Sequence, residues 1–314
     1  MKILVVGKNN VMKWPFAVEK AFSSMGHTTR LFIFNQRTIG YCFKCLFGKK
    51  KRRQWLAQKL TKQIHQFNPD LIVFVSFGFI PLELYEAAGR FDIKQVAWAA
   101  DKFGSSEKVR AKYLDALFCS DTGYISYAKN FGCPVYYLPL CADTNVFQNK
   151  NVKKTLPPVF VGSANNLREK YFVACQEKCL LYGKGWNKKQ MPQHEVHNQR
   201  ISSKKAAKMV EQSVAPLNLG FSVNNVSGLN FRPFEIGAIG SLIVTNNVPD
   251  LELCYKVGKE ALCYETPDDF NNLVKDIVRY PKKYEKIAKA GYERTMKDHT
   301  YFARLSQMLG YIFK

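Results

Sequence analysis

The chain has 314 residues, of which 46% are hydrophobic, and a formal net charge of +22 at pH 7. This length suits two domains rather than one core, and the composition excludes a disordered chain. No apolar run reaches the roughly 18 residues that a membrane-spanning helix needs. The chain begins directly with a short apolar run, which lacks the length and cleavage site of a signal peptide. We therefore expect a folded cytoplasmic protein whose charge reflects an anionic partner, with general solubility as the alternative.

The first half alternates short apolar runs with helical segments. The run at 70–75 is apolar throughout, as in a strand buried on both faces of a parallel sheet. Because strands are separated by helices, the pattern predicts a doubly wound parallel sheet. We expect strands at 3–6, 28–34, 70–75, 95–99, 116–119 and 135–138, and helices at 15–25, 54–67 and 81–89.

The second half repeats this pattern after a polar stretch at 148–158 that is typical of a linker. The sequence therefore predicts an α/β protein with two Rossmann-like domains, 1–150 and 151–314, and a last helix that packs back on the first domain. Ligands of such folds bind at the carboxyl ends of the strands, here in a cleft that faces both sheets. We expect strands at 159–161, 179–182, 215–219, 242–245 and 261–264, helices at 202–212 and 234–239, and helix almost throughout from 267.

Two turns in the second half are candidates for contact with a ligand. In the first, the strand at 159–161 runs into Gly162 and Ser163 and then into a helix that carries Arg168. Backbone N–H groups at a helix start and one cation together form an anion site. The alternative is an ordinary Rossmann-like turn.

The second turn is Gly183-Lys184-Gly185-Trp186, at the end of the strand at 179–182. Glycines allow the backbone to turn tightly and to approach a ligand closely. Trp186 either covers a flat ring of the ligand or packs beneath the loop.

The segment 217–251 is the most informative. Its strand ends at Gly220, an Asn-rich loop follows, and a helix is expected to begin near Arg232-Pro233. Arg232, the helix dipole and backbone N–H groups suit a diphosphate, and Glu235 suits a ribose diol. The alternative is a purely structural helix start. The candidate nucleotide contacts are Gly228, Leu229, Asn230, Phe231, Arg232 and Glu235.

These motifs resemble those of the group-1 glycosyltransferases, in particular the branch with the spore-maturation (CgeB-like) proteins. The resemblance covers most of residues 158–306 and is weaker in the first half. It implies a GT-B fold, a nucleoside-diphosphate sugar as donor (UDP- or GDP-sugar) and no obligatory metal. It also implies that Glu235 holds the donor ribose and that Arg168 and Arg232 neutralise the diphosphate. The matching positions are Gly228, Asn230, Arg232, Phe234, Glu235, Gly240, Thr245, Pro249 and Asp250.

One position departs from the family pattern. Larger group-1 enzymes have a further glutamate where this chain has Ser227, so the stereochemical outcome stays open. Catalysis would rest on stabilisation of the leaving phosphate by cations, Arg232 above all. Asp101, at the end of a strand in the first half, is the candidate base for an inverting reaction. The alternative is a turn or capping aspartate.

A basic segment at 36–69 contains no acidic residue. Its mixture of cations and aromatic residues, centred on Lys44 to Lys62, suits an anionic membrane surface or a lipid-linked acceptor. It also suits nucleic-acid phosphates and bases, or a solvated loop. We expect a transferase that builds a cell-envelope glycan or glycolipid at the inner membrane face. The alternatives are a sugar transferase acting on nucleic acid and a non-catalytic basic binding protein. The cations are Arg37, Lys44, Lys49, Lys50, Lys51, Arg52, Arg53, Lys59 and Lys62.

Overall fold

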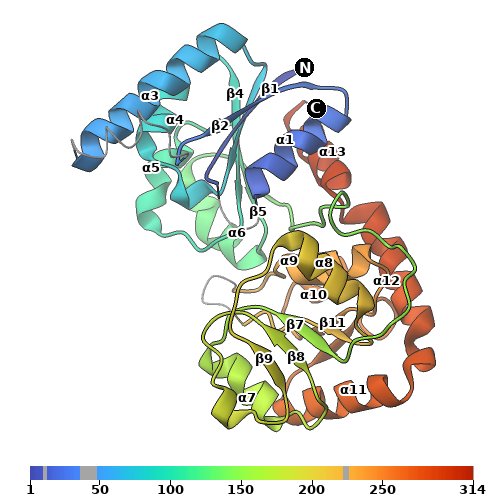
Figure 1. Ribbon diagram of the computed structural model, residues 1–314. Coiled ribbons are helices and arrows are strands. Elements are labelled where there is room, and N and C mark those ends of the chain that lie inside the picture. Colours follow the sequence, from blue (N-terminus) through green and yellow to red (C-terminus); the bar gives the residue numbers. More distant parts are fainter. Residues whose placement is uncertain (10–12, 36–47, 222–225, 314) are drawn as a thin grey trace. The chain divides into compact units, whose positions relative to one another are not determined.

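A computed structural model describes residues 1–9, 13–35, 48–221 and 226–313. The chain divides into two compact units (Figure 1). Unit 1 comprises Met1–Pro139 together with Tyr301–Lys314, and unit 2 comprises Leu140–Thr300. The division therefore falls after Pro139, somewhat before the boundary expected from the polar stretch.

Unit 1 contains a six-stranded parallel sheet with the order β2-β1-β3-β4-β5-β6. All six strands predicted from the first half are present. β1 and β3 are central and buried, which explains their unbroken apolar sequence. The strands are β1 (Lys2–Gly7), β2 (Thr28–Ile33), β3 (Leu71–Val75), β4 (Lys94–Ala99), β5 (Ala116–Cys119) and β6 (Val135–Tyr137). The helices are α1 (Trp14–Ser24), α3 (Gly48–Phe67), α4 (Leu82–Ala88), α5 (Lys108–Ala111), α6 (Thr122–Ala128) and α13 (Tyr301–Ile312), with 3-10 turns at Phe77–Phe79, Ser105–Glu107 and Lys129–Phe131.

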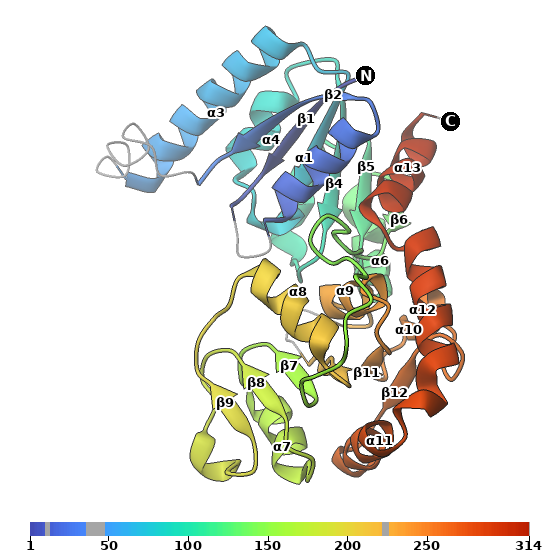
Figure 2. The ribbon, with the colours of Figure 1, turned by 45° about the vertical axis from the view of Figure 1, so that its right-hand side comes forward.

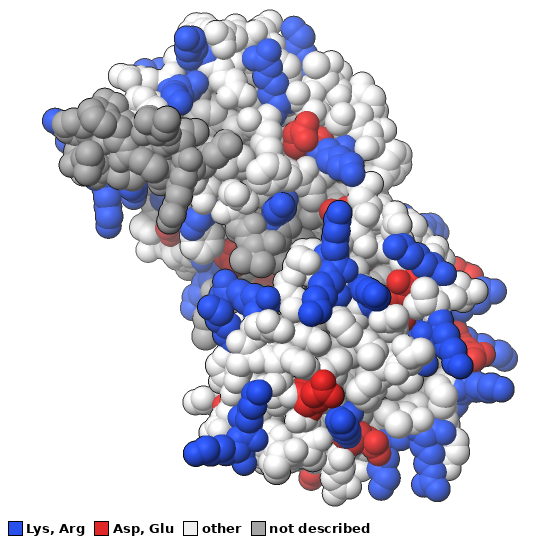
Figure 3. All heavy atoms as spheres, viewed as in Figure 1, with Lys and Arg blue, Asp and Glu red and all other residues white. Residues whose placement is uncertain are grey.

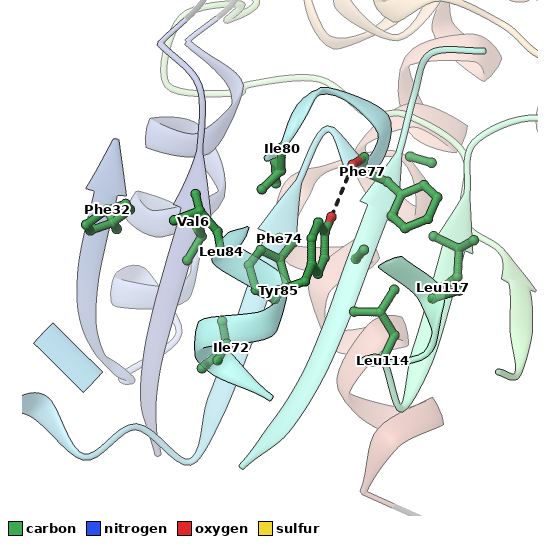
Figure 4. Packing of buried hydrophobic residues seen from close by; sticks show 14 of the residues in the cluster. Val6, Phe32, Ile72, Phe74, Phe77, Ile80, Leu84, Tyr85, Leu114 and Leu117 are labelled. Atoms are coloured by element: carbon green, nitrogen blue, oxygen red, sulfur yellow. Dashed lines mark hydrogen bonds between the residues drawn. The ribbon is translucent and has the colours of Figure 1, made fainter. Parts of the chain in front are cut away.

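Helices cover both faces of this sheet. Ile72 and Phe74 point to the face covered by α4, where the ring of Phe74 lies 4.2 Å from that of Tyr85 (Figure 4). The buried hydroxyl of Tyr85 donates a 3.1 Å hydrogen bond to the carbonyl oxygen of Phe77. On the other face α1 packs beside α13, so the last helix of the chain belongs to unit 1 (Figure 2).

Unit 2 contains a second parallel sheet, with the order β12-β11-β10-β7-β8-β9. The five predicted strands are present, and the sixth, β9, was not expected because its three residues include no apolar run. The strands are β7 (Val159–Val161), β8 (Leu180–Tyr182), β9 (Glu195–His197), β10 (Pro216–Leu217), β11 (Val244–Asn246) and β12 (Leu262–Tyr264). The helices are α7 (Asn166–Ala174), α8 (Ser203–Gln212), α9 (Phe231–Ala238), α10 (Leu251–Cys254), α11 (Pro267–Arg279) and α12 (Glu285–Asp298), with 3-10 turns at Lys188–Gln190 and Pro281–Tyr284.

Two glycines, one within α9 and one just after it, have different structural roles. A Cβ at Gly237 would lie 2.1 Å from Oγ1 of Thr295, so this glycine lets α9 approach α12. Gly240 has φ +77° just beyond the helix, a left-handed conformation that ends it without a steric cost. The helix starts at Phe231, slightly earlier than expected.

Candidate functional site

The candidate site lies at the carboxyl edge of the sheet of unit 2. Taken from β9 to β12, the strand order is that of a dinucleotide-binding fold, with its switch point between β7 and β10. Gly162 and Ser163 follow β7, and Leu219 and Gly220 follow β10. The topology thus brings two of the predicted segments together at the position where such sheets bind ligands.

Arg168 connects the two loops at the switch point. Its Nε donates a 2.9 Å hydrogen bond to the carbonyl oxygen of Leu219, and its Nη1 donates a 2.7 Å bond to that of Ser163. The guanidinium lies 5.4 Å from the centre of the Phe160 ring, and burial lowers the pKa of Arg168 from its ordinary value. Neither hydrogen bond is to a carboxylate, so the loops are joined by a group that adds positive charge.

The glycines after β8 allow two loops to touch. A Cβ at Gly183, which has φ +153°, would lie 1.9 Å from the carbonyl oxygen of Gly162. Hydrogen bonds from Gly162 N to Tyr182 O, at 2.8 Å, and from Ala164 N to Lys184 O, at 2.9 Å, fix this contact. Gly185 is also left-handed, with φ +88°. These glycines shape the loops through backbone contact.

Trp186 lies beneath these loops. Its side chain is buried, and its Nε1 donates a 3.1 Å hydrogen bond to the carbonyl oxygen of Gly162. The ring packs edge-on against Phe160 and Phe172 in the core of unit 2. Of the two interpretations of the sequence, the structure shows the packed tryptophan, and its contact with a ligand stays a prediction.

The start of α9 contains the predicted diphosphate and ribose residues. Asn230 caps the helix, and its Oδ1 accepts a 3.1 Å hydrogen bond from Arg232 N. Leu229 is buried and Gly228 lies next to it. Residues 222–225 of the preceding loop lie outside the described part of the chain.

Arg232 and Glu235 face each other. Nη1 of Arg232 lies 2.6 Å from Oε2 of Glu235, whose side chain is only 5% exposed. The two atoms are close but not aligned as a hydrogen bond, and Nε of Arg232 also has no acceptor among the described residues. Burial raises the pKa of Glu235 and Asp143 adds to the rise, whereas Arg232 opposes it. If the two residues have their predicted roles, the contact between Arg232 and Glu235 must break, so that Arg232 can bind the diphosphate and Glu235 the ribose.

A polar network at the ends of β10 and β11 was missed in the sequence. Nδ2 of Asn218 donates a 2.8 Å hydrogen bond to Oγ1 of Thr245, and Gly220 N donates a 2.7 Å bond to Oδ1 of Asn246. The hydroxyl of Tyr264 donates to the carbonyl oxygen of Asn218. The available signal was the change from apolar to amide and hydroxyl residues at the ends of two neighbouring strands. The network fixes the loop that Arg168 also holds.

Helix starts at this edge share an unusual charge pattern. α7, α8 and α9 begin with the neutral caps Asn165, Ser202 and Asn230, and each carries a basic residue in its first turn. These residues are Arg168, Lys204 with Lys205, and Arg232. A helix N-terminus favours acidic residues, so cations there add to the positive dipole instead of balancing it. Glu169 in the first turn of α7 offsets Arg168, whereas α8 and α9 have no acidic residue in the first turn. The edge therefore concentrates positive potential mainly at the starts of α8 and α9.

Asp101 belongs to unit 1, where it follows β4 at the carboxyl edge of that sheet. It is half-buried, and this burial raises the pKa of its carboxyl group. A raised pKa is compatible with a role as a base, and that role stays a prediction.

The basic segment is described only in part, since Arg37 and Lys44 lie outside the described residues. The remainder forms α3, whose apolar face is buried on the sheet of unit 1 and whose lysines are exposed. Arg53 pairs with Glu83 of α4 at 3.7 Å. An open groove of about 970 Å³ between α3 and α4 includes Lys50 and Lys62 but also Glu83 and Glu86. Carboxylates thus offset part of the charge of this helix.

Among the described residues there is no cluster of histidine, cysteine, aspartate and glutamate that could hold a metal ion. Nor does any helix in that part of the chain have the length and apolar character to cross a membrane.

Comparisons with known proteins give a family match for part of the chain and a shared fold for nearly all of it. Residues 161–310 match a family model described as glycosyl transferase-like. No curated protein sequence matches the chain significantly. Solved structures match it over nearly its whole length at low identity, which establishes a shared GT-B fold. The family match covers slightly less than half of the chain, and together with this fold it supports a glycosyltransferase enzyme.

Three of these structures are informative. A glycosyltransferase from Rickettsia africae has 12% identity and a TM-score of 0.73, with 99% of this chain and 97% of that chain covered. The HepE protein of Anabaena, solved with UDP and glucose, has 10% identity and a TM-score of 0.67, with 100% and 99% covered. A DNA-modifying β-glucosyltransferase, studied with and without uridine diphosphoglucose, has 13% identity and a TM-score of 0.66, with both chains covered completely.

Proposed function

We propose that this chain transfers a sugar from a UDP- or GDP-sugar, held at the carboxyl edge of unit 2, to an anionic or membrane-associated acceptor. The carrying observation is the pair of helix starts at the switch point: α7 after β7 and α9 after β10 have neutral caps, and Arg168 and Arg232 lie in their first turns. A diphosphate supplies the negative charge that these dipoles and cations favour. The complexes of HepE with UDP and of the DNA-modifying enzyme with its donor agree with a nucleotide-sugar donor.

In this proposal Arg232 and Glu235 of α9 bind different parts of the donor. Arg232 turns to the diphosphate, where it stabilises the charge that builds up as the nucleotide leaves, and Glu235 accepts hydrogen bonds from the ribose. The unsatisfied Nε of Arg232 supports this exchange, because a buried guanidinium nitrogen without an acceptor gains more from a phosphate than a satisfied one does. Arg168 keeps its hydrogen bonds to the carbonyl oxygens of Leu219 and Ser163, and it adds positive charge behind the two loops that would hold the diphosphate.

The acceptor side of the proposal rests on α3 and Asp101. The exposed lysines of α3, with the basic residues before it in the sequence, suit an anionic membrane surface or a lipid-linked acceptor such as a cell-envelope glycan precursor. Asp101 serves as base, and its raised pKa helps it to take a proton from an acceptor hydroxyl. Membership in the spore-maturation branch is part of the same proposal.

A thermal-shift screen against UDP-, GDP-, TDP- and CMP-sugars tests the donor site. We expect stabilisation by one nucleotide family, and we expect Glu235→Gln, which keeps the shape of the side chain, to reduce it strongly. A matched control is Glu211→Gln, since Glu211 is also buried in unit 2 but binds Lys150 N instead. Folded protein that responds to no nucleotide, or equally in both variants, would reject the donor site. Nucleotide binding without any hydrolysis or transfer would favour a non-catalytic binding protein.

A further inference from the structure

One exposed surface of unit 2 is more basic than the proposed function requires. In α8, Lys204 and Lys205 occupy the first turn and Lys208 follows one turn later. The spacing of one and four residues places all three on one side of the helix, and all three are exposed. Lys and Arg side chains gather over this helix in the space-filling view (Figure 3). We call these three residues the α8 lysine face.

This face lacks compensating acids. The acidic residue of α8, Glu211, is buried, and its Oε1 accepts a 2.7 Å hydrogen bond from Lys150 N. No described residue forms an ion pair with any of the three lysines. The first two also stand at the positive end of the helix dipole, where a cation is unfavourable. Lys205 gains one local contact, since its Nζ lies 5.4 Å from the centre of the Tyr182 ring. Lys204 and Lys208 have no ion pair or ring contact with a described residue, so local stability gives no reason for three lysines on this face.

A second helix of unit 2 shows what an ordinary solvated face looks like. α12 also carries the exposed lysines Lys286, Lys289 and Lys297. It interleaves them with acidic residues, and it forms the ion pairs Lys289–Glu293, at 3.9 Å, and Arg294–Asp298, at 2.8 Å. The lysines of α8 thus lack the compensation that the lysines of α12 have within the same unit.

The position of the face connects it to the candidate site. α8 follows β9, so its first turn begins at the carboxyl edge of the sheet, where the loops after β7 and β8 also lie (Figure 2). Lys184, exposed in the loop after β8, extends the positive surface along this edge. An anionic polymer lying here would run beside the loops that we assign to the donor.

We propose that the α8 lysine face binds the phosphate backbone of a nucleic acid. Between Lys178 and Gln212 no large hydrophobic side chain is exposed, so this surface offers nothing to insert into a bilayer. It offers instead exposed amide donors, such as Asn187 and Gln199, of the kind that bind phosphate oxygens beside lysines. The isoelectric point of about 9.6 provides the long-range attraction typical of nucleic-acid-binding proteins. This binding does not depend on the proposed sugar transfer.

The test compares two triple variants of the full chain, each with three lysines fewer. One is Lys204→Gln, Lys205→Gln and Lys208→Gln, and the control is Lys286→Gln, Lys289→Gln and Lys297→Gln on α12. The affinity for a short fluorescent DNA duplex is measured by anisotropy over a series of salt concentrations. Each lost phosphate contact lowers the slope of log affinity against log salt by about 0.9, so we expect the α8 variant to lose a slope of about 2.7. We expect its affinity to fall at least tenfold in moderate salt.

The control variant should keep the slope and affinity of the wild type. An equal fall in both variants would show attraction by net charge alone and overturn the proposal, as would binding to anionic phosphatidylglycerol vesicles without binding to the duplex. The melting temperature of the α8 variant should stay close to that of the wild type, because two cations leave a helix N-terminus while the contact of Lys205 with the Tyr182 ring is lost. Its thermal shift with nucleotide sugar should be unchanged, so a failed donor screen leaves this test intact.

Discussion

The carboxyl edges of the two sheets differ in the helix caps and in the loop residues that follow the strands. In unit 1, α6 follows β5 and begins with an acidic cap, since Oδ1 of Asp121 accepts a hydrogen bond from Gly123 N, whereas α3 follows β2 and begins with three lysines and no acidic residue. In unit 2, α8 and α9 begin with neutral caps and cations and have no acidic residue in the first turn, whereas α7 has Glu169 there as well as Arg168. The loop after β3 in unit 1 continues into the buried Phe77, whereas the loop after β10 in unit 2 receives Arg168. The loops that follow β3 and β10 thus serve an apolar core in unit 1 and positive potential in unit 2.

This difference indicates where binding and stability compete. An edge built for its own stability places acids at helix starts and satisfies its polar groups. Unit 2 does the opposite at Lys204 and Lys205, which lie in a helix start without an ion pair to a described residue, and at Arg232, whose Nε has no acceptor although Nη1 lies beside Glu235. Such exceptions to local rules are typical of functional positions. The comparison predicts that substitutions at the carboxyl edge of unit 2 change ligand binding. Matched substitutions elsewhere should change the unfolding free energy and leave ligand binding intact.

The largest expected effect is that of Gly183→Ala. The new methyl group would lie 1.9 Å from the carbonyl oxygen of Gly162, and neither backbone segment can move without losing the hydrogen bonds between the loops. We expect a loss of at least about 3 kcal/mol in the free energy of unfolding, measured by urea denaturation, and loss of the nucleotide-dependent thermal shift.

The control for this change is Gly258→Ala in the same unit. Gly258 is also left-handed, with φ +77°, but a Cβ there would meet no atom within 4 Å. Its cost should stay at about 1–2 kcal/mol, the cost of a left-handed alanine, with nucleotide binding intact. Equal losses in the two variants would show that backbone conformation alone, rather than the contact between loops, explains the effect.

The second effect concerns the cation at the switch point. Arg168→Met keeps the length of the side chain but leaves the carbonyl oxygens of Ser163 and Leu219 without their donors. We expect a loss of about 2–3 kcal/mol in stability and a further weakening of nucleotide binding. The matched change in unit 1 is Arg30→Met, where the guanidinium lies over the Phe67 ring, at 4.9 Å. That variant should lose about 0.5–1 kcal/mol and keep full binding.

The third prediction concerns pH and Glu235. Because its pKa in the folded protein is raised above the ordinary value, the folded state holds this proton at pH values where the unfolded chain has released it. Stability should therefore fall as pH rises from about 4.5 through the folded pKa. Glu235→Gln cannot ionise and so removes this dependence. The unfolding free energy of the wild type should therefore rise relative to that of the variant as the pH is lowered toward about 4.5, and fall relative to it as the pH is raised. Denaturation curves across this range measure it, and a difference independent of pH would contradict the raised pKa.

Much of this fold could be predicted from periodicity, because β1, β3 and β4 are largely apolar runs between helical segments. The short strand β9 could not, since two of its three residues are polar and its position depends on pairing with β8. The segment at α9 was located, but the contact between Arg232 and Glu235 was not predicted, although their spacing of three residues allows such a pair. The burial of Trp186 depends on Phe160 and Phe172, which only the folded chain brings together.

The smallest effect is expected when the cap residues of α8 in unit 2 and α6 in unit 1 are exchanged. Ser202→Asp keeps an acceptor for the N–H of Lys205 and adds a negative charge at the start of α8, beside two lysines. We expect it to raise the unfolding free energy by about 0.3–1 kcal/mol, and Asp121→Ser at α6 to lower it by a similar amount. If the edge of unit 2 is shaped by its ligand, the more stable Ser202→Asp variant should bind the DNA duplex more weakly than the wild type, because the added charge offsets one lysine. A variant that gains both stability and affinity would contradict the trade-off, since a cap optimised only for folding would then have improved binding as well.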